Sequence, residues 1–489
     1  MKGMSLKVLG ILLMLVLQAS WGIAYSQPPG AWFTVFGGAE YEAVTGVSAM
    51  SPNNVFASGG TNSTTEPGDL SDGFIVMHDG NGGIAWGRLI DLSNIDFATR
   101  LQSSGGLVYV TGHTNSGSGT PDMNVFLAAF TPSGSTSWFY VYNNSPLYQD
   151  FAMDVYVDGV MYTYIVGYTV DPLTGLSDVL LLKVFSSNAS VVWAIRIGEP
   201  LINETGFGVV ADPTGIYIVG STNTTGLTLG IPPNDINLLV MKVYHNGTIA
   251  WFRVLNLSIV DYGFKTVLDP HGYLYIVGEA REDLYGNDIV LGKFSASDGS
   301  LVYLKRIHYW RFDEGFDIAY YNNSIYIAGA GYPVYPLKSL YEIYALSLWD
   351  NGSLKWFAKI GGPDMDQGAA IDVYNGLVYL GGFTASWGAG AIDSFTMLLN
   401  TGYSEYGWCN PRLGVVNLEL VGNATVYDAT YDEPPYDPLV DSVPAIPILV
   451  DTGVRDWSPS LETTCMYPVV GGEAVIEDNW YSLPVTGIL

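Results

Sequence analysis

The sequence predicts an all-β protein: a seven-bladed β-propeller closed by its N-terminal strand, with a C-terminal β-rich appendage. An aromatic residue recurs every 52 to 58 residues, at Trp32, Trp86, Trp138, Trp193, Trp251, Tyr303 and Trp356. Each interval repeats four short runs of the residues that favour β-strands. No stretch after residue 26 has apolar residues at the spacing of an α-helix. Hydrophobic residues make up 48% of the 489 residues, so the chain can bury a large core.

Residues 1–26 have the three-part layout of a secretory signal peptide. Lys2 and Lys7 precede an apolar run over Val8–Leu17, and small residues follow, so we expect cleavage after Ala24 or Ser26. An uncleaved anchor is the alternative, although the run is short for a membrane span. The mature chain is therefore expected to be secreted and to lie at the extracellular cell surface, with no membrane span.

Residues 27–402 are assigned to the propeller. In the fourth repeat the runs are Gly208–Ala211, Ile216–Gly220, Ile236–Val243 and Ile249–Val254. The intervening Asp212-Pro213-Thr214-Gly215 predicts a tight hairpin between the first two runs. Between the third and fourth runs a glycine usually stands four residues before the aromatic residue, with Ala189 as an exception. Seven four-stranded meanders in series predict a propeller, which leaves only short, protected edges.

The N-terminal strand closes this predicted ring. After Trp356 the chain supplies three more runs, which end near Leu399, and no fourth run follows. The unmatched strand is Trp32–Phe36, so we expect it to be the outermost strand of the seventh blade. An open solenoid with an unpaired end is the alternative.

The repeat resembles a known family. Its motifs are Ile360-Gly361-Gly362, Asp366-x-Gly368, Val378-Tyr379-Leu380-Gly381-Gly382 and Asp393-x-Phe395. They resemble the seven-bladed β-propeller repeat of secreted bacterial and archaeal surface proteins, over residues 31–402. The resemblance implies a fold and an extracellular setting, and the family has no shared enzymatic residues to carry over.

Two acidic positions recur in every repeat. The first register precedes the first run and consists of Glu42, Asp96, Asp150, Glu204, Asp261, Asp313 and Asp366. The second register precedes the third run and consists of Asp72, Asp122, Asp178, Asp235, Asp288, Glu342 and Asp393. We expect these carboxylates to make one face electronegative. They either accept hydrogen bonds from backbone N–H groups in their turns or, in the first register, bind Ca²⁺. The net charge of −28 argues against a nucleic-acid partner.

Aromatic residues in the long loops are candidates for binding a sugar or a protein partner. They are Tyr332, Tyr335, Tyr341 and Trp387. Ten Asn-x-Ser/Thr sequons predict glycosylation, at Asn62, Asn143, Asn188, Asn203, Asn223, Asn246, Asn256, Asn322, Asn351 and Asn423. Asn188, Asn246 and Asn351 fall at or near hairpin tips on the opposite face, which would leave the acidic face free for contacts.

Signatures of an enzyme are poor. The five histidines lack metal-ligand spacing, and no nucleophile elbow, phosphate loop or dinucleotide fingerprint occurs. We therefore expect a non-enzymatic binding or structural module, without a cofactor unless Ca²⁺ binds. A quinone-dependent oxidoreductase, suggested by the repeated Gly-x-x-x-Trp, and a propeller lyase or glycosidase remain alternatives.

Residues 403–489 form the predicted appendage. Val415–Val421, Ala424–Tyr427 and Ile446–Val450 read as strands. The two cysteines, Cys409 and Cys465, are expected to form a disulfide, with two buried thiols as the alternative. The segment packs on its own propeller or adds its strands to another subunit, as a filament or surface-layer component would. The scarcity of Cys and Gln and the many Val, Ile and Tyr residues suggest a heat-loving archaeon.

Overall fold

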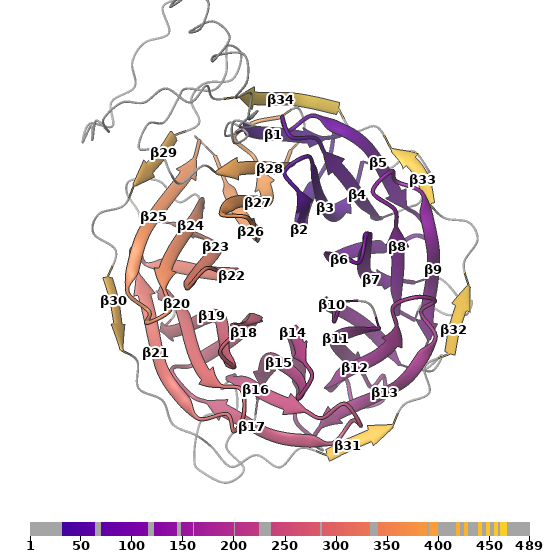
Figure 1. The fold of residues 1–489 in the computed structure, drawn as a ribbon, viewed down its shortest axis with the longest axis vertical. Helices are drawn as coiled ribbons and strands as arrows, with labels where there is room; N and C mark the ends of the chain where they lie inside the picture. The colour runs from indigo at the N-terminus through magenta and orange to yellow at the C-terminus, as the bar shows by residue number, and fades with distance from the viewer. Residues whose placement is uncertain are drawn as a thin grey trace, which may run out of the picture.

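The computed structural model describes most of the repeat region and six strands after it. The described residues are 32–63, 70–115, 122–143, 148–159, 161–199, 201–223, 236–283, 286–332, 341–362, 364–388, 391–399, 417–420, 425–428, 439–442, 446–449, 454–457 and 460–466. Every regular element among them is a β-strand, and the sheets stand around a common centre (Figure 1). The predicted all-β, propeller-like class is confirmed, while the predicted signal peptide lies outside the described residues.

The first four sheets are antiparallel meanders of four consecutive strands. The first contains β2 (Glu42–Ser51), β3 (Asn54–Thr61), β4 (Asp72–His78) and β5 (Ile84–Ile90). The second contains β6 (Asp96–Ser104), β7 (Leu107–Thr114), β8 (Asn124–Phe130) and β9 (Thr136–Asn143). The third contains β10 (Gln149–Val157), β11 (Tyr162–Val170), β12 (Ser177–Phe185) and β13 (Val191–Gly198). The fourth contains β14 (Glu204–Asp212), β15 (Gly215–Thr222), β16 (Asn237–Val243) and β17 (Ile249–Leu255).

The last three sheets repeat the same order. The fifth contains β18 (Val260–Leu268), β19 (Tyr273–Asp283), β20 (Gly286–Ser295) and β21 (Leu301–His308). The sixth contains β22 (Phe312–Tyr321), β23 (Ser324–Tyr332), β24 (Glu342–Trp349) and β25 (Leu354–Gly361). The seventh contains β26 (Asp366–Tyr374), β27 (Leu377–Thr384), β28 (Asp393–Leu399) and β1 (Trp32–Gly37). A single parallel bridge, Asn287 with Phe312, connects the fifth and sixth sheets.

The core lies between neighbouring sheets. The middle strands are covered on both faces, and all seven residues of β16 are buried. One core cluster joins Val166 and Leu181 of the third sheet to Ile218 and Met241 of the fourth. The middle strands therefore read as continuous apolar runs, because each face packs on a neighbouring sheet.

The N-terminal strand pairs with the last repeat, as predicted. β1 runs antiparallel to β28, with Trp32 opposite Leu398 and Phe36 opposite Ser394. It is the fourth strand of this sheet and not the outermost, because β34 (Ser460–Met466) pairs on its other side.

Hydrogen bonds from backbone N–H groups to aspartate side chains join neighbouring sheets near their inner strands. The Asp154 carboxylate in the third sheet accepts the Val209 N–H of the fourth at 2.8 Å. The Asp372 carboxylate in the seventh sheet accepts the Ala49 N–H of the first at 2.7 Å. The second bond links residues 323 positions apart in the chain, so the two ends of the repeat region meet in space.

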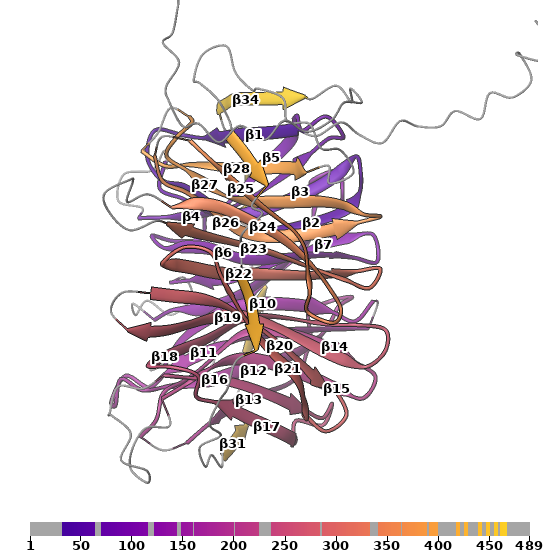
Figure 2. The ribbon, with the colours of Figure 1, turned by 90° about the vertical axis from the view of Figure 1, so that its left-hand side faces the viewer.

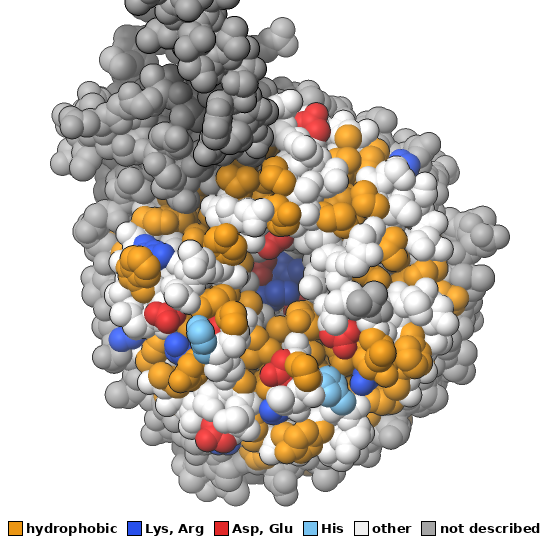
Figure 3. Space-filling view, in the orientation of Figure 1, with side chains coloured by type: hydrophobic (Ala, Val, Ile, Leu, Met, Phe, Trp, Pro, Cys, Tyr) orange, Lys and Arg blue, Asp and Glu red, His pale blue; other side chains and the backbone are white. Residues whose placement is uncertain are grey.

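Charged side chains occupy the centre of the ring. Arg100 of the second sheet donates to the Ala369 carbonyl at 3.3 Å and to the Phe316 carbonyl at 3.5 Å. Lys265 of the fifth sheet forms an ion pair with Asp154 of the third. Figure 3 shows a hollow at the centre with basic and acidic side chains inside it. These groups cross-link sheets that are not neighbours in sequence.

The strands after residue 416 lie on the outside of the ring, where Figures 1 and 2 show them in colours from orange to yellow. They are β29 (Asn417–Leu420), β30 (Thr425–Asp428), β31 (Leu439–Ser442), β32 (Ile446–Leu449), β33 (Val454–Trp457) and β34. Each pairs antiparallel with an outer strand of the ring: β29 with β25, β30 with β21, β31 with β13, β32 with β9, β33 with β5 and β34 with β1. The predicted appendage strands at 415–421, 424–427 and 446–450 correspond to β29, β30 and β32.

Among the described residues, no helix is long and apolar enough to cross a membrane. Cys465 lies in β34 opposite Phe33. Cys409 lies outside the described residues, so the disulfide stays a prediction.

Candidate functional site

The first acidic register is buried. All seven side chains stand at the start of an inner strand, and none is more than 2% exposed. The Asp96 carboxylate accepts the N–H groups of Leu92 and Ser93 at 2.7 and 2.8 Å, and the Asp366 carboxylate accepts the Gly362 N–H at 2.8 Å. Such carboxylates hold the turn that enters each sheet. Their burial does not fit the expected electronegative face, because they present no charge to solvent.

The partner of this acid differs in two sheets. In five sheets a threonine of the second strand stands opposite it, as Thr61 does for Glu42 and Thr384 for Asp366. In the fifth sheet this position is Ala280, and in the sixth it is Gly331. The junction of the fifth and sixth sheets therefore breaks the repeat.

Gly331 makes room for a different hydrogen-bond donor. A Cβ at this position would lie 2.2 Å from the Tyr344 hydroxyl. That hydroxyl donates to the Asp313 Oδ1 at 3.2 Å, in the place that a threonine takes elsewhere. Burial raises the pKa of Asp313 to about 7, against the N–H bonds from Tyr309 and Trp310 that lower it.

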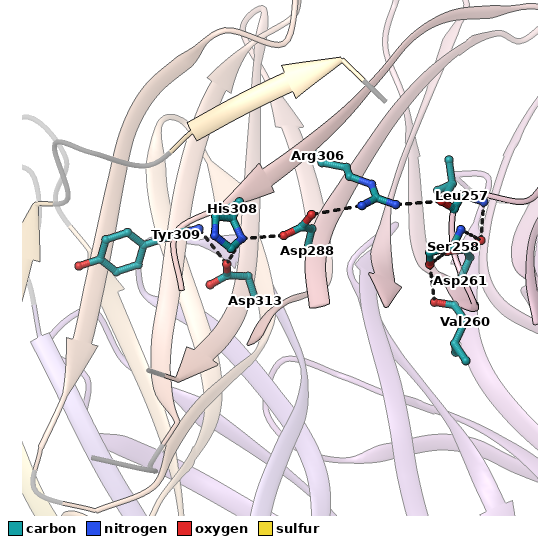
Figure 4. Close-up of polar contacts among 9 residues, drawn as sticks. All are labelled: Leu257, Ser258, Val260, Asp261, Asp288, Arg306, His308, Tyr309 and Asp313. Atoms are coloured by element: carbon teal, nitrogen blue, oxygen red, sulfur yellow. Dashed lines mark hydrogen bonds and ion pairs between the residues drawn. The ribbon is translucent and has the colours of Figure 1, made fainter. Parts of the chain in front are cut away.

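The outer half of this junction holds a histidine between two carboxylates. Figure 4 shows His308 beside Asp288 and Asp313, with its Nδ1 2.8 Å from Asp288 Oδ1 and 3.6 Å from Asp313 Oδ2. Arg306 pairs with Asp288 at 3.4 Å and donates to the Leu257 carbonyl at 3.0 Å. The His308 side chain is 49% exposed, so solvent reaches an otherwise buried network.

The inner half of the junction holds two glutamates joined by one amide. The Asn287 Nδ2 donates to Glu279 Oε2 at 3.1 Å and to Glu314 Oε1 at 3.2 Å, and Arg281 Nε donates to the Asn287 Oδ1 at 3.1 Å. Burial and, second to it, the charge of Glu314 raise the pKa of Glu279 to about 7. Tyr341 hydrogen-bonds to Glu314. The sequence reasoning missed this pair, since neither glutamate belongs to a repeated register.

The equivalent positions in the other five sheets carry no carboxylate. The counterparts of the glutamates in the second and third sheets are Phe97, His113, Phe151 and Tyr168. His113 lies 5.8 Å from Phe97 and 5.2 Å from Phe151, and burial lowers its pKa to about 4. Two carboxylates therefore take these positions at the junction of the fifth and sixth sheets, whereas rings meet there at the junction of the second and third sheets.

The predicted binding aromatics have different surroundings. Tyr332 is partly exposed, stacks on Phe312 at 4.3 Å and meets Tyr341 edge-on at 4.6 Å, beside the glutamate pair. Trp387 is 4% exposed and packs edge-on against Phe33, so its predicted role as an exposed binding residue is wrong. Tyr335 lies outside the described residues.

The second acidic register pairs with bases on the fourth strand in three sheets. Asp178 lies 3.1 Å from Arg196, Asp288 lies 3.4 Å from Arg306, and Glu342 lies 3.2 Å from Lys359. Asp72, Asp122 and Asp393 are buried, and Asp235 lies outside the described residues. Much of the acidic excess that repeats with the sheets is therefore internal.

Two groups among the described residues bring three candidate metal ligands together. Asp288, His308 and Asp313 form one, and Asp72, Asp91 and Asp96 form the other, with ligand atoms within 4.8 Å of one another. Of the seven first-register acids, Asp96 and Asp313 belong to such groups. Ca²⁺ binding at these acids stays a prediction.

Several sequons have a structural role in their own turn. The Asn246 Oδ1 accepts the Thr248 N–H at 3.1 Å and its hydroxyl at 2.7 Å. Asn188 and Asn351 make the same pair of bonds, and Asp298 makes it without being a sequon. All three asparagines are exposed at hairpin tips, and Asn423 lies outside the described residues. The triplet is thus also a turn motif, and glycosylation stays a prediction.

Comparisons with known proteins leave the family open. No protein-family model matches the chain, and no curated protein matches it. Among solved structures, a phage phi92 endosialidase is 10% identical to this chain, with a TM-score of 0.38. The match covers 81% of this chain and 76% of the endosialidase chain. A putative 6-phosphogluconolactonase from Bacteroides uniformis is 11% identical with a TM-score of 0.38, covering 85% and 100%. One from Bacteroides fragilis is 10% identical with a TM-score of 0.39, covering 81% and 99%.

Proposed function

We propose that the chain is a closed seven-bladed β-propeller outside the cell that binds a carbohydrate at the junction of its fifth and sixth sheets. Ring closure is supported by the pairing of β1 with β28 and by the Asp372 bond to the Ala49 N–H. Export is supported by the signal-peptide layout of residues 1–26. The resemblance to surface-protein repeats agrees with this setting.

One observation carries the binding proposal. Glu279 and Glu314 place two carboxylates at positions where the other five sheets have none, and they lie beside the partly exposed Tyr332 and Tyr341. Sugars present hydroxyl donors around an apolar C–H face. Carboxylates accept from the hydroxyls, while an aromatic ring packs on that face.

A glycan array followed by calorimetry on the mature chain tests this proposal. Glu314→Gln removes one charge-assisted acceptor, worth about 1.5–3 kcal/mol, so affinity should fall by roughly 10- to 150-fold. Tyr332→Ala should weaken binding through lost stacking. Gln367→Ala, at the corresponding position of the seventh sheet, is the matched control and should bind like the parent chain. Equal losses in the control, or no glycan bound by the parent chain, would refute the site.

A second candidate uses the same carboxylates for glycoside hydrolysis. It is favoured by the pKa of about 7 for Glu279, which suits a general acid, next to a second carboxyl group. We expect binding without turnover. Release of reducing sugar by the parent chain and its loss in Glu314→Gln would favour the enzyme instead.

A further inference from the structure

The strap is the segment over residues 417–466 that contains β29 to β34, and the rim is the set of outer ring strands that it meets. Along the chain, the strap strands pair with the sixth, fifth, third, second, first and seventh sheets, in that order, and each of these pairings is called a stop. The strap therefore runs around the ring in the direction opposite to that in which the chain forms the first to seventh sheets. Each stop adds a fifth strand to a four-stranded sheet.

Charge marks the register at four of the six stops. The directly opposed pairs are Arg88 with Asp456, Arg196 with Asp441, Lys305 with Asp428 and Lys359 with Glu419. Opposite charges at directly opposed positions of an antiparallel pair stabilise it, and a slip of one residue separates them. Residues 403–489 hold 13 acids against two bases, whereas the whole chain has only 19 Lys and Arg. Acidic residues of the strap therefore stand opposite basic residues of the rim in these four pairings.

The fourth sheet is passed without a stop. Among the described strands, none of the strap pairs with β17. Residues 429–438, which separate β30 from β31 in the sequence, include Pro434, Pro435 and Pro438, which have no N–H to give to a ladder. The strap is therefore a series of separate short pairings and not one continuous sheet.

The strap is attached to the ring through a long connection. β28 ends at Leu399 in the seventh sheet and β29 begins at Asn417 on the neighbouring sixth sheet, so residues 400–416 join them. By contrast, three residues suffice between β21 of the fifth sheet and β22 of the sixth. Seventeen residues can span up to roughly 60 Å when extended, which is enough to reach the rim of another molecule.

From these observations we propose that the rim is an acceptor surface for acidic extended strands, and that its partner is the strap of a second copy. Five strap strands have only four residues each, so each pairing is weak alone and can leave the ring without unfolding it. The same pairs form within one chain or between two, and only the connection decides which. Exchange of straps joins two copies, and the multiple stops hold them together.

Complementary charge reversal tests the exchange. Copy A carries Arg88→Glu and Lys305→Glu, and copy B carries Asp456→Lys and Asp428→Lys. Each copy alone opposes like charges at two stops, while a mixture restores opposite charges only between chains. Light scattering after gel filtration should report a two-chain mass for the mixture and a one-chain mass for A and B alone. One-chain masses in the mixture, with both copies folded by circular dichroism, would overturn the proposal.

A cross-linking experiment covers the case in which a charge variant fails to fold. Arg88→Cys and Asp456→Cys are placed on separate chains that lack Cys409 and Cys465. Directly opposed strand positions are close enough for a disulfide, so oxidation of the mixture should link two chains through residues 88 and 456. Asp451→Cys, outside the paired strands, is the control for random oxidation. A disulfide that forms only when both cysteines are on one chain shows a strap that does not exchange.

Discussion

Replacing Gly134 with alanine should destabilise the protein for two separable reasons. Gly134 lies in the turn between the third and fourth strands of the second sheet and has a φ of +83°. An added Cβ would lie 2.8 Å from Trp86 and 2.9 Å from the Arg88 guanidinium, which belong to the first sheet. Gly247 occupies the same turn in the fourth sheet with a φ of +88°, but there the nearest atoms lie 3.7 and 3.8 Å away.

The two glycines therefore separate backbone strain from crowding. A left-handed conformation costs an L-residue about 1–2 kcal/mol. The lost flexibility of the unfolded chain offsets about 0.4–1 kcal/mol of this. Crowding in a packed contact adds about 1–3 kcal/mol. We expect Gly247→Ala to cost about 1 kcal/mol and Gly134→Ala about 3 kcal/mol.

Urea unfolding followed by tryptophan fluorescence measures the two free energies of unfolding. The informative quantity is the difference between the two variants, expected near 2 kcal/mol, because the strain cancels. Ala189→Gly is the reverse test, since Ala189 takes a φ of 54° in the same turn of the third sheet and glycine should relieve that strain. Equal costs at Gly134 and Gly247 would refute the idea that this turn packs tightly on the preceding sheet.

Three further predictions concern buried charge. Lys265→Met should cost about 3–5 kcal/mol in urea unfolding because it leaves Asp154 buried without its cation, and adding Asp154→Asn should recover part of the loss. Burial raises the pKa of Asp313 to about 7 and of Asp366 to about 6, so the folded state binds these protons more tightly than the unfolded chain does. Their stabilising contribution is complete below about pH 4 and is lost as the pH rises through 6 to 7. Asp313→Asn should reduce this dependence of the melting temperature on pH. Thr384→Val should destabilise by about 1–3 kcal/mol, since the Asp366 carboxylate loses a buried donor, and an unchanged melting temperature would contradict that role.

The repeat architecture could be predicted because its signals are local. Strand runs, hairpin turns and the aromatic spacing each depend on a few neighbouring residues, and seven copies confirm one another. Even the unmatched strand at Trp32 follows from counting runs. The repeated acids were harder, because a carboxylate before a strand suits a turn, a cation or a charged surface equally, and burial decides among these only in three dimensions.

The site and the strap depend on long-range relations that no local pattern encodes. Glu279 and Glu314 lie 35 positions apart in the chain and meet because β19 and β22 belong to neighbouring sheets. Trp387 looks like a loop aromatic in sequence, but it packs under β1, which lies more than 300 residues earlier. The strap strands are short, and their pairing partners are set by the route of the chain around the rim. The acid–base pairs between strap and rim could have been found only by aligning the two segments in reverse order.

The two departures from the repeat follow from one physical constraint. A ring of like sheets offers equal junctions and equal edges, so a ligand or a partner gains specificity only where a copy differs. At the junction of the fifth and sixth sheets, Gly331 admits the Tyr344 hydroxyl, and Asn287 joins the buried Glu279 to the partly buried Glu314. At the rim, the bases opposite strap acids stand on four outer strands, β5, β13, β21 and β25, and the proposed exchange depends on them. The proposed binding at the junction and the proposed assembly at the rim use different residues, so a variant of Glu314 should leave strap exchange intact, and reversal of Arg88 should leave glycan binding intact.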